Sequence, residues 1–321
     1  MINIIDLNYS HNPYPLLSQN IIDLILENIS KNKKTLLFLN RRWESNSLIC
    51  KDCSNQIKCD FCDIWMVLHK YPLQKLICHH CHNEKEIPMT CPKCHSTNLN
   101  QVWVWIQKVE DNIRKIFKEN EIIRLDSDKI HKEWISREDI KKAQIIISTE
   151  SVNTISIDNL GLVWFLLLEL EFLIPEYNIE EQIYDNISYN MKRWSDIAIQ
   201  TYIPNSSFIN ILTEWNFKDF LMTSLKERKD FNYPPYKELV YVWVKSKSQE
   251  KVKDIIIKLK NKLEINNTEN KKVIFYDKEL FSKRASEYHQ KIVIKWEDLQ
   301  EFLSCIKFEV FRNKEINIEW K

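Results

Sequence analysis

The sequence contains a single glycine among its 321 residues, although a typical protein of this length has roughly 22. Dinucleotide-binding and P-loop motifs each need several glycines close together, because a bare backbone must approach the phosphates. The shortage therefore excludes an ordinary motif of either kind. Tryptophan shows the opposite bias, with eleven residues.

Long hydrophobic runs are also missing. The most apolar segment, residues 160–175, carries Glu169 and Glu171, and it is shorter than the about 20 apolar residues of a membrane span. Residues 1–20 lack the basic stretch and apolar core of a signal peptide. We therefore expect a cytoplasmic protein with no membrane partner, and we interpret the apolar segment as a strand inside a sheet.

The chain as a whole has almost no net charge, but its parts do. The formal total of +1 predicts no general affinity for polyanions, and a hydrophobic fraction of 44% excludes global disorder. Residues 101–215 carry a net −7, whereas residues 216–321 carry a net +6. The contrast predicts separate units in a chain long enough for two or three domains.

Apolar and amphipathic segments alternate over the first two thirds of the chain. The pattern predicts helices at 20–30, 109–117 and 179–191 and strands at 35–40, 122–125, 145–148, 162–168 and 197–202. Such alternation, with apolar strand interiors, predicts an α/β fold with a parallel sheet covered by helices. A long helix is expected at 208–231.

The pattern changes from residue 233. It predicts strands at 239–244, 273–276, 291–295 and 315–320, with helices at 250–263 and 298–306. The order βαββαβ predicts a small ferredoxin-like α+β unit at the C-terminal end.

Eight of the nine cysteines form Cys-x-x-Cys pairs, namely Cys50/Cys53, Cys59/Cys62, Cys78/Cys81 and Cys91/Cys94. Each pair presents two thiolates from one tight turn, and two pairs complete a tetrahedral Zn²⁺ site. Paired cysteines in a cytosolic chain favour metal over disulfides. We predict two zinc ions per chain with a structural role, because an all-cysteine site has no open position for catalysis.

The spacing indicates which pairs combine. Fifteen residues separate Cys62 from Cys78, which is the spacing of a zinc ribbon and predicts one site from Cys59, Cys62, Cys78 and Cys81. The outer pairs, Cys50/Cys53 and Cys91/Cys94, would then form a site around it; sequential pairing is the alternative. The histidines at 69, 79, 80 and 82 are interpreted as surface residues, and Cys305 as a small core residue.

Several segments together resemble one known family. Leu36-Leu-Phe-Leu-Asn-Arg-Arg42 precedes the cysteines, Tyr233-Pro-Pro-Tyr236 follows Glu227-Arg228, and Tyr288-His-Gln-Lys-Ile-Val-Ile-Lys295 lies further on. With the cysteine pairs, they resemble primosomal protein N′, the bacterial replication-restart helicase family. The resemblance covers essentially all 321 residues but only the C-terminal half of that family's proteins.

The resemblance implies a domain organisation. It places a second RecA-like helicase lobe at 1–49 and 99–205, interrupted by a double zinc-binding insertion at 50–98 with the nested pairing of cysteines. A helical connector at 206–232 leads to a C-terminal domain at 233–321 that is similar to a small-subunit ribosomal protein. The family binds branched or single-stranded DNA, unwinds it with ATP and reloads the replisome, so single-stranded DNA-binding protein and other primosome components are implied partners.

The sequence departs from the family in the motifs that bind and hydrolyse ATP. The family's first lobe, with its phosphate-binding loop and magnesium motif, has no counterpart in these residues, and Thr149-Glu-Ser-Val-Asn-Thr-Ile155 replaces a further motif. The arginine-donating motif should fall near 184–193, where only Lys192 and Arg193 are present. Phosphoryl transfer needs a phosphate cradle, a metal carboxylate and usually an arginine finger. We therefore expect no catalytic residue and no ATP binding by this chain alone.

Four tryptophans stand where the family pattern has glycine, at Trp43, Trp103, Trp105 and Trp194. An indole is the least suitable replacement for a residue that supplies unusual backbone conformations or close approaches. We hypothesise that the source genome reads UGA as glycine. Genuine tryptophans, as platforms for bases or as simple core, are the alternative.

The basic C-terminal unit is the expected DNA-binding surface, with Lys283, Arg284, Lys291 and Lys295 as candidate contacts. Arg41 and Arg42 are a second candidate pair. Phosphate contacts would give salt-dependent, sequence-independent affinity, whereas a solvated charged face is the alternative.

Two further charged groups have simpler interpretations. Glu227 and Arg228 are expected to make a structural ion pair or helix-end contact. The acidic residues 176, 180, 181 and 185 are interpreted as a solvated helix face or a dock for a basic partner.

Together these features predict a zinc protein of replication restart that binds forked DNA and primosome partners without its own ATPase. Two alternatives stay open. The chain could be one half of a split ATP-dependent 3′-5′ DNA helicase whose first lobe is a separate polypeptide, or a zinc-ribbon interaction module without DNA binding.

Overall fold

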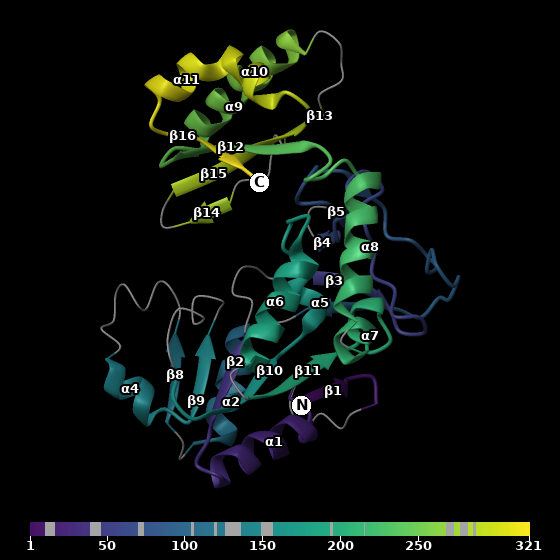
Figure 1. Cartoon of the computed structure of the whole chain (residues 1–321), viewed down its shortest axis with the longest axis vertical. Coiled ribbons are helices and arrows are strands. Elements are labelled where there is room, and N and C mark those ends of the chain that lie inside the picture. The colour runs from purple at the N-terminus through teal and green to yellow at the C-terminus, as the bar shows by residue number, and fades with distance from the viewer. Residues whose placement is uncertain are drawn as a thin grey trace.

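The structure is a computed structural model, and it describes most of the chain. The described residues are 1–9, 17–38, 46–69, 74–103, 106–118, 121–125, 136–148, 157–192, 195–214, 216–267, 273–276, 282–284 and 287–321. At 103, 106–108, 273–276 and 282–284 the description covers the backbone alone. Figure 1 shows a sheet unit at one end of the long axis and the C-terminal unit at the other, with helix α8 (Phe217–Asp230) running between them.

The first unit is a six-stranded parallel sheet with the strand order β1-β11-β10-β2-β9-β8. Its strands are β1 (Ile2–Asp6), β2 (Lys34–Phe38), β8 (Ile122–Leu125), β9 (Ile145–Ser148), β10 (Leu160–Phe165) and β11 (Asp196–Thr201). Its helices are α1 (Gln19–Ser30), α2 (Ile106–Ile116), α4 (Arg137–Lys142), α5 (Leu168–Glu171) and α6 (Ile179–Lys192). The predicted parallel sheet is confirmed. The strand expected at 162–168 ends earlier, because Leu168 begins α5.

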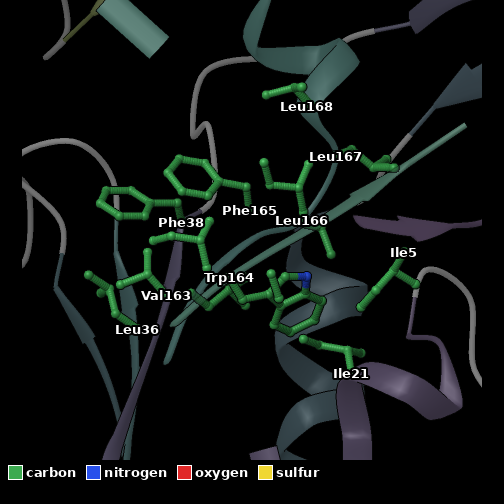
Figure 2. Packing of buried hydrophobic residues seen from close by; sticks show 14 of the residues in the cluster. Ile5, Ile21, Leu36, Phe38, Val163, Trp164, Phe165, Leu166, Leu167 and Leu168 are labelled. Carbon is green, nitrogen blue, oxygen red and sulfur yellow. The ribbon is translucent and has the colours of Figure 1, made fainter. Parts of the chain in front are cut away.

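The core of this unit lies where α1 packs against β2 and β10. Every residue of β10 is buried, as expected of a strand inside a parallel sheet. Figure 2 shows Trp164 of β10 pointing toward Ile21 of α1 and Ile5 of β1. The neighbouring Phe165 ring stacks on Phe38 with the ring centroids 5.0 Å apart.

The one glycine of the chain lies at the start of β10, where α1 and its following turn approach closely. A Cβ atom at Gly161 would be 2.5 Å from Asn28 Oδ1 and 2.8 Å from Lys33 Cβ. A side chain therefore does not fit at this position without movement of the neighbouring backbone.

The cysteine-rich region is inserted through a pair of antiparallel strands. Strand β3 (Asn46–Cys50) leads into it and pairs with β7 (Leu99–Trp103), which leads out. Between them, β4 (Val67–His69), β5 (Lys75–Ile77) and β6 (Glu84–Lys85) form a small antiparallel sheet. Strands β4 and β5 lie between Cys62 and Cys78, within the fifteen residues that separate the two inner turns.

Two helices, α7 (Ser207–Glu214) and α8, replace the single helix expected at 208–231. The break precedes Asn216, whose side chain accepts a hydrogen bond from the backbone N–H of Asp219 at 3.3 Å. Asparagine at this position satisfies one of the free N–H groups at the start of a new helix. The connection between the first and last units therefore contains two helices rather than one.

The C-terminal unit is an antiparallel sheet in which β13, β15, β12 and β16 lie in that order. Its strands are β12 (Glu238–Ser246), β13 (Val273–Tyr276), β14 (Ser282–Arg284), β15 (Glu287–Trp296) and β16 (Ile316–Trp320), with β14 also pairing to β15. Its helices are α9 (Gln249–Asn266), α10 (Leu299–Phe302), the 3₁₀ turn η2 (Leu303–Ile306) and α11 (Lys307–Arg312). All four predicted strands are present, whereas the helix expected at 298–306 is divided.

The two faces of this sheet have different partners, because side chains alternate along a strand. Val240, Val242 and Ile294 point into a core shared with α9 and α10. Tyr241 and Val293, one residue along, belong instead to a core shared with the cysteine-rich insertion. The insertion therefore covers the second face of the C-terminal sheet.

No helix within the described ranges is both long enough and apolar enough to cross a membrane.

Candidate metal centres and the surrounding interface

The four Cys-x-x-Cys turns share one backbone geometry. In each, the first cysteine accepts a hydrogen bond from the N–H four residues later, as in Asp63 N–H to Cys59 O at 2.9 Å. The same cysteine donates its own N–H to the carbonyl five residues later, as in Cys59 to Ile64 at 2.9 Å. The repeated turn points both sulfurs of each pair to one side.

The same residue of each turn adopts the left-handed backbone conformation. The fourth residue after each first cysteine has a φ between 53° and 61°, and these residues are Ser54, Asp63, His82 and His95. Glycine adopts this conformation without steric cost, whereas other residues pay for it. Here the four tight turns are built without glycine.

The inner group of sulfurs comes from Cys59, Cys62, Cys78 and Cys81, whose Sγ atoms all lie within 4.8 Å of one another. The Sγ–Sγ distance is 3.4 Å for Cys59–Cys81 and 3.4 Å for Cys62–Cys78. Hydrogen bonds with the other three sulfurs hold the pKa of the Cys59 thiol well below its usual range. A divalent cation at the same point would favour ionisation of all four thiols.

The outer group comes from Cys50, Cys53, Cys91 and Cys94, again with all four Sγ atoms within 4.8 Å. The Sγ–Sγ distance is 3.6 Å for Cys50–Cys94 and 3.6 Å for Cys53–Cys91. Burial opposes ionisation of Cys91, but the backbone N–H groups of Cys94 and Lys93 outweigh it and lower the pKa of Cys91 to about 7. Cys94 is exposed, so this group lies nearer to the surface than the inner one.

Both groups fit a zinc ion. Zn–S bonds of about 2.3 Å in a tetrahedron place the sulfurs about 3.8 Å apart, close to the distances in both groups. The grouping is the nested one that the spacing favours, with Cys50/Cys53 and Cys91/Cys94 around the inner pairs. The chain thus has two four-cysteine groups that could each hold zinc, as predicted for its cofactor.

The inner group is directly connected to the C-terminal unit. Cys59, Cys62 and Cys78 belong to the same buried cluster as Tyr233 and Tyr241. The hydroxyl of Tyr233 donates a hydrogen bond of 2.9 Å to the backbone carbonyl of Cys62. Tyr233 is the first residue of the Tyr-Pro-Pro-Tyr segment, so that segment contacts the metal-binding turn.

A stack of cations and aromatic rings continues from Tyr233 in two directions. The Tyr233 ring stacks on Tyr177 with centroids 4.9 Å apart and planes 13° apart. Arg228 lies over the Tyr177 ring at 4.9 Å, and Lys295 lies over the Tyr233 ring at 4.3 Å. The stack joins α8, the segment before α6, the Pro-Pro segment and β15.

Glu227 and Arg228 make intramolecular contacts, as interpreted from the sequence. Arg228 forms an ion pair with Glu181 and donates to the carbonyl of Pro234 at 3.0 Å. Glu227 lies 3.9 Å from the ammonium of Lys58 in the insertion. These contacts hold α8 between the insertion and α6.

The acidic residues near the start of α6 are not a free face. Lys321 lies 3.3 Å from Glu176, and Glu181 is occupied by Arg228. Glu180 lines a pocket between the insertion and α8, and burial raises its pKa to about 7 although Lys58 opposes the shift. Their interpretation as a solvated face or a basic-partner dock is wrong for these three residues.

The predicted DNA contacts divide into three groups. Lys291 and Lys295 are buried, with exposed fractions of 9% and 3%. They share the face of β15 that the insertion covers, so their assignment to an exposed basic face is wrong. Lys283 and Arg284 lie on β14, where only the backbone is described, and Arg41 and Arg42 lie outside the described residues.

Other sequence-derived candidates also lie outside the described residues. These are Trp43, Trp105, Trp194, Arg193 and the segment 149–155, and for Trp103 the side chain is not described. Lys192 is the last residue of α6.

The histidines of the insertion do not behave alike. His69 and His79 are half-buried, with their Nε2 atoms 2.7 Å apart. His80 is completely buried, with its ring 5.9 Å from that of Tyr233 and 6.0 Å from that of Tyr241. The prediction of a surface position is wrong for His80, because the C-terminal sheet covers it. Cys305 is half-buried and packs against the core of the C-terminal unit.

Comparison with known proteins gives one family and a consistent set of relatives. The family "PriA DNA helicase Cys-rich region (CRR) domain" matches residues 59–85, which contain the inner cysteine group. "Replication restart protein PriA" of Bacillus subtilis is 26% identical over 91% of this chain, and that of Thermotoga maritima is 25% identical over 88%. The Rickettsia conorii protein of the same name is 28% identical over all of this chain.

The matches cover only part of each relative. The aligned region spans 38% of the Bacillus subtilis protein, 39% of the Thermotoga maritima protein and 52% of the Rickettsia conorii protein. This chain therefore spans about half the length, or less, of the curated relatives it matches. The resemblance proposed from the sequence motifs is confirmed.

Proposed function

We propose that this chain, which is similar in sequence to the C-terminal half of PriA replication restart proteins, binds branched or forked DNA and primosome partners during replication restart. In this proposal, Cys50, Cys53, Cys91 and Cys94 bind a first zinc ion and Cys59, Cys62, Cys78 and Cys81 bind a second. The observation that carries it is the inner cysteine group, whose geometry suits zinc and whose segment matches the family's cysteine-rich region. The chain alone has no ATPase activity.

The proposed organisation follows the family. The parallel sheet unit is a second RecA-like helicase lobe, made of residues 1–49 and 99–205, and residues 50–98 are its zinc-binding insertion. Residues 206–232 form the connector, and residues 233–321 form a ferredoxin-like domain similar to a small-subunit ribosomal protein. The strand order β13-β15-β12-β16 supports the last assignment, because it places the first and third strands of the βαββαβ unit at the centre.

The proposed DNA contacts are Lys283, Arg284, Arg41 and Arg42. Lys283 and Arg284 lie on β14, which pairs with residues 287–289 of β15. Contacts to phosphates alone suit a protein that recognises a junction of strands rather than a base sequence.

The DNA contacts can be tested with a labelled forked DNA and the purified chain. We expect affinity to fall steeply with salt and to fall by about tenfold or more in Lys283→Glu/Arg284→Glu. The matched control is Lys247→Glu/Lys258→Glu, which makes the same charge change at two exposed lysines of the same unit. Binding that is unaffected by salt, or weakened equally by both double variants, would contradict the proposed surface.

The second candidate function is one half of a split helicase. The name of the relatives motivates it, since the family model is that of a DNA helicase region and the aligned part spans 38% of one relative and 52% of another. ATP hydrolysis should then appear only when a separate polypeptide that carries a P-loop lobe is added to this chain and forked DNA. Hydrolysis by the purified chain alone, lost in Cys78→Ser, would contradict the proposal that the chain has no motor of its own.

A further inference from the structure

Strand β15 carries a buried lysine beside the inner cysteine group. Lys295 is 3% exposed and lies on the face of β15 that the insertion covers, as does Val293 of the shared buried cluster. A buried ammonium group costs several kcal/mol unless nearby negative charge and hydrogen bonds compensate for it. The protein must therefore supply compensation at this position.

Neutral contacts provide part of that compensation. Lys295 Nζ donates a hydrogen bond of 2.6 Å to the carbonyl of Phe231 and lies 4.3 Å from the centroid of the Tyr233 ring. Among the ion pairs of the described residues, none joins Lys295 to a carboxylate. Within the described part of the chain, the groups that oppose the loss of the Lys295 charge are cysteine sulfurs rather than carboxylates.

Lys295 approaches the inner cysteine group through Tyr233. The ring under its ammonium belongs to the buried cluster that contains Cys59, Cys62 and Cys78, and the hydroxyl of that ring binds the Cys62 carbonyl. Burial lowers the pKa of Lys295, and the thiolates of Cys62, Cys81 and Cys59 oppose that shift. Four thiolates around one Zn²⁺ ion carry a net charge of about −2. This charge is itself buried, since Cys59 and Cys62 are almost inaccessible to solvent, and it needs a cation nearby.

A neighbouring lysine on the same strand provides a comparison. Lys291 is also buried, over the ring of Tyr241 at 4.2 Å. Burial lowers its pKa to about 8, but Glu176 is the strongest of the groups that oppose the shift, followed by Cys78. A carboxylate therefore helps to keep Lys291 charged. For Lys295, the groups that oppose the fall in pKa are cysteine sulfurs of the inner group.

We propose that Lys295 is the counter-cation of the inner zinc–thiolate centre and that this pairing docks the C-terminal sheet onto the insertion. The inference rests on the zinc ligation proposed above. Binding of zinc ionises the four thiols and creates the charge that Lys295 neutralises. Loss of zinc allows thiols of this group to take up protons, so the buried ammonium of Lys295 loses counter-charge.

The coupling works in both directions, because two equilibria that share one interaction affect each other equally. Removal of the Lys295 charge should weaken retention of the inner ion. Removal of the inner ion should loosen β15 and the Tyr233 segment from the insertion. The proposal couples the inner centre to the C-terminal unit, because the buried cluster that they share contains Cys59, Cys62 and Cys78 but no cysteine of the outer group.

The test uses the full zinc-loaded chain and follows release of each ion to an excess of chelator. Lys295→Met keeps the length of the side chain but removes its charge, and we expect the slow release phase of the buried inner ion to accelerate by about tenfold or more. Lys295→Arg keeps the charge and should restore slow release. Lys291→Met should have a smaller effect, and Lys258→Met, at an exposed position of the same unit, should have none.

A second measurement covers the case in which the variants fold poorly. Amide hydrogen exchange of the wild-type chain, before and after removal of the inner ion, should show faster exchange in β15 and at Tyr233 while α9 is less affected. Unchanged release in Lys295→Met, equal acceleration in Lys295→Arg, or unchanged exchange would overturn the proposal. A wild-type chain that binds no zinc would instead refute the ligation on which it rests, so the two failures are distinguishable.

Discussion

The hydroxyl of Tyr233 offers the sharpest single-atom test of the interface between the insertion and the C-terminal unit. Tyr233 is 4% exposed, and its hydroxyl donates to the Cys62 carbonyl at 2.9 Å. Tyr233→Phe keeps the ring that contacts Tyr177 and Lys295 but leaves a buried carbonyl without this donor. Such a loss costs about 1–3 kcal/mol. We therefore expect the free energy of unfolding in urea to fall by that amount.

The matched control is Tyr236→Phe, three residues along the same segment. Tyr236 is exposed, so loss of its hydroxyl should change the free energy of unfolding by less than about 0.5 kcal/mol. Release of the inner zinc ion should also be faster in Tyr233→Phe, because the hydrogen bond holds the backbone of a ligand. Equal stability of the two variants would refute the argument that this hydrogen bond connects the two units.

Three further predictions concern other parts of the chain. Burial raises the pKa of Glu180 from the ordinary 4.5 to about 7, so its contribution to stability is lost as pH rises through that window. Glu180→Gln should therefore raise the urea midpoint much more at pH 8 than at pH 5, and an equal or smaller increase at pH 8 would contradict this. At the left-handed position of His95, His95→Val should be less stable than His95→Gly by about 1–2 kcal/mol, and equal unfolding midpoints would count against that cost. The gene should carry UGA, not UGG, at the codons for Trp43, Trp103, Trp105 and Trp194.

The apolar strands and the cysteine turns were predictable because their signals are local. Strands at 122–125 and 145–148 have the bounds that their apolar runs indicate. The four Cys-x-x-Cys turns are equally local, and their spacing alone favoured the nested arrangement. The start of α8 also has a local signal, since Asn216 and Asp219 have the spacing of a helix cap. The apolar residues that continue on both sides of this cap obscure the boundary between the two helices.

The environment of the C-terminal sheet was not predictable in the same way. Alternation places Lys291 and Lys295 on one face of β15, but it does not say whether water or protein covers that face. The covering element is the insertion, which lies far earlier in the chain. The same contact buries His80, although its position in a polar turn suggested exposure. Burial that depends on distant segments leaves no pattern in the local sequence.

The central claim, two zinc ions in a nested arrangement, is tested most directly by the zinc content of two double variants. Cys50→Ser/Cys94→Ser removes two ligands of the outer group, so the account predicts that the purified chain keeps one ion. Cys50→Ser/Cys62→Ser removes one ligand from each group, so both ions should be lost. Retention of one ion in the second variant, with none in the first, would show sequential pairing and contradict the account.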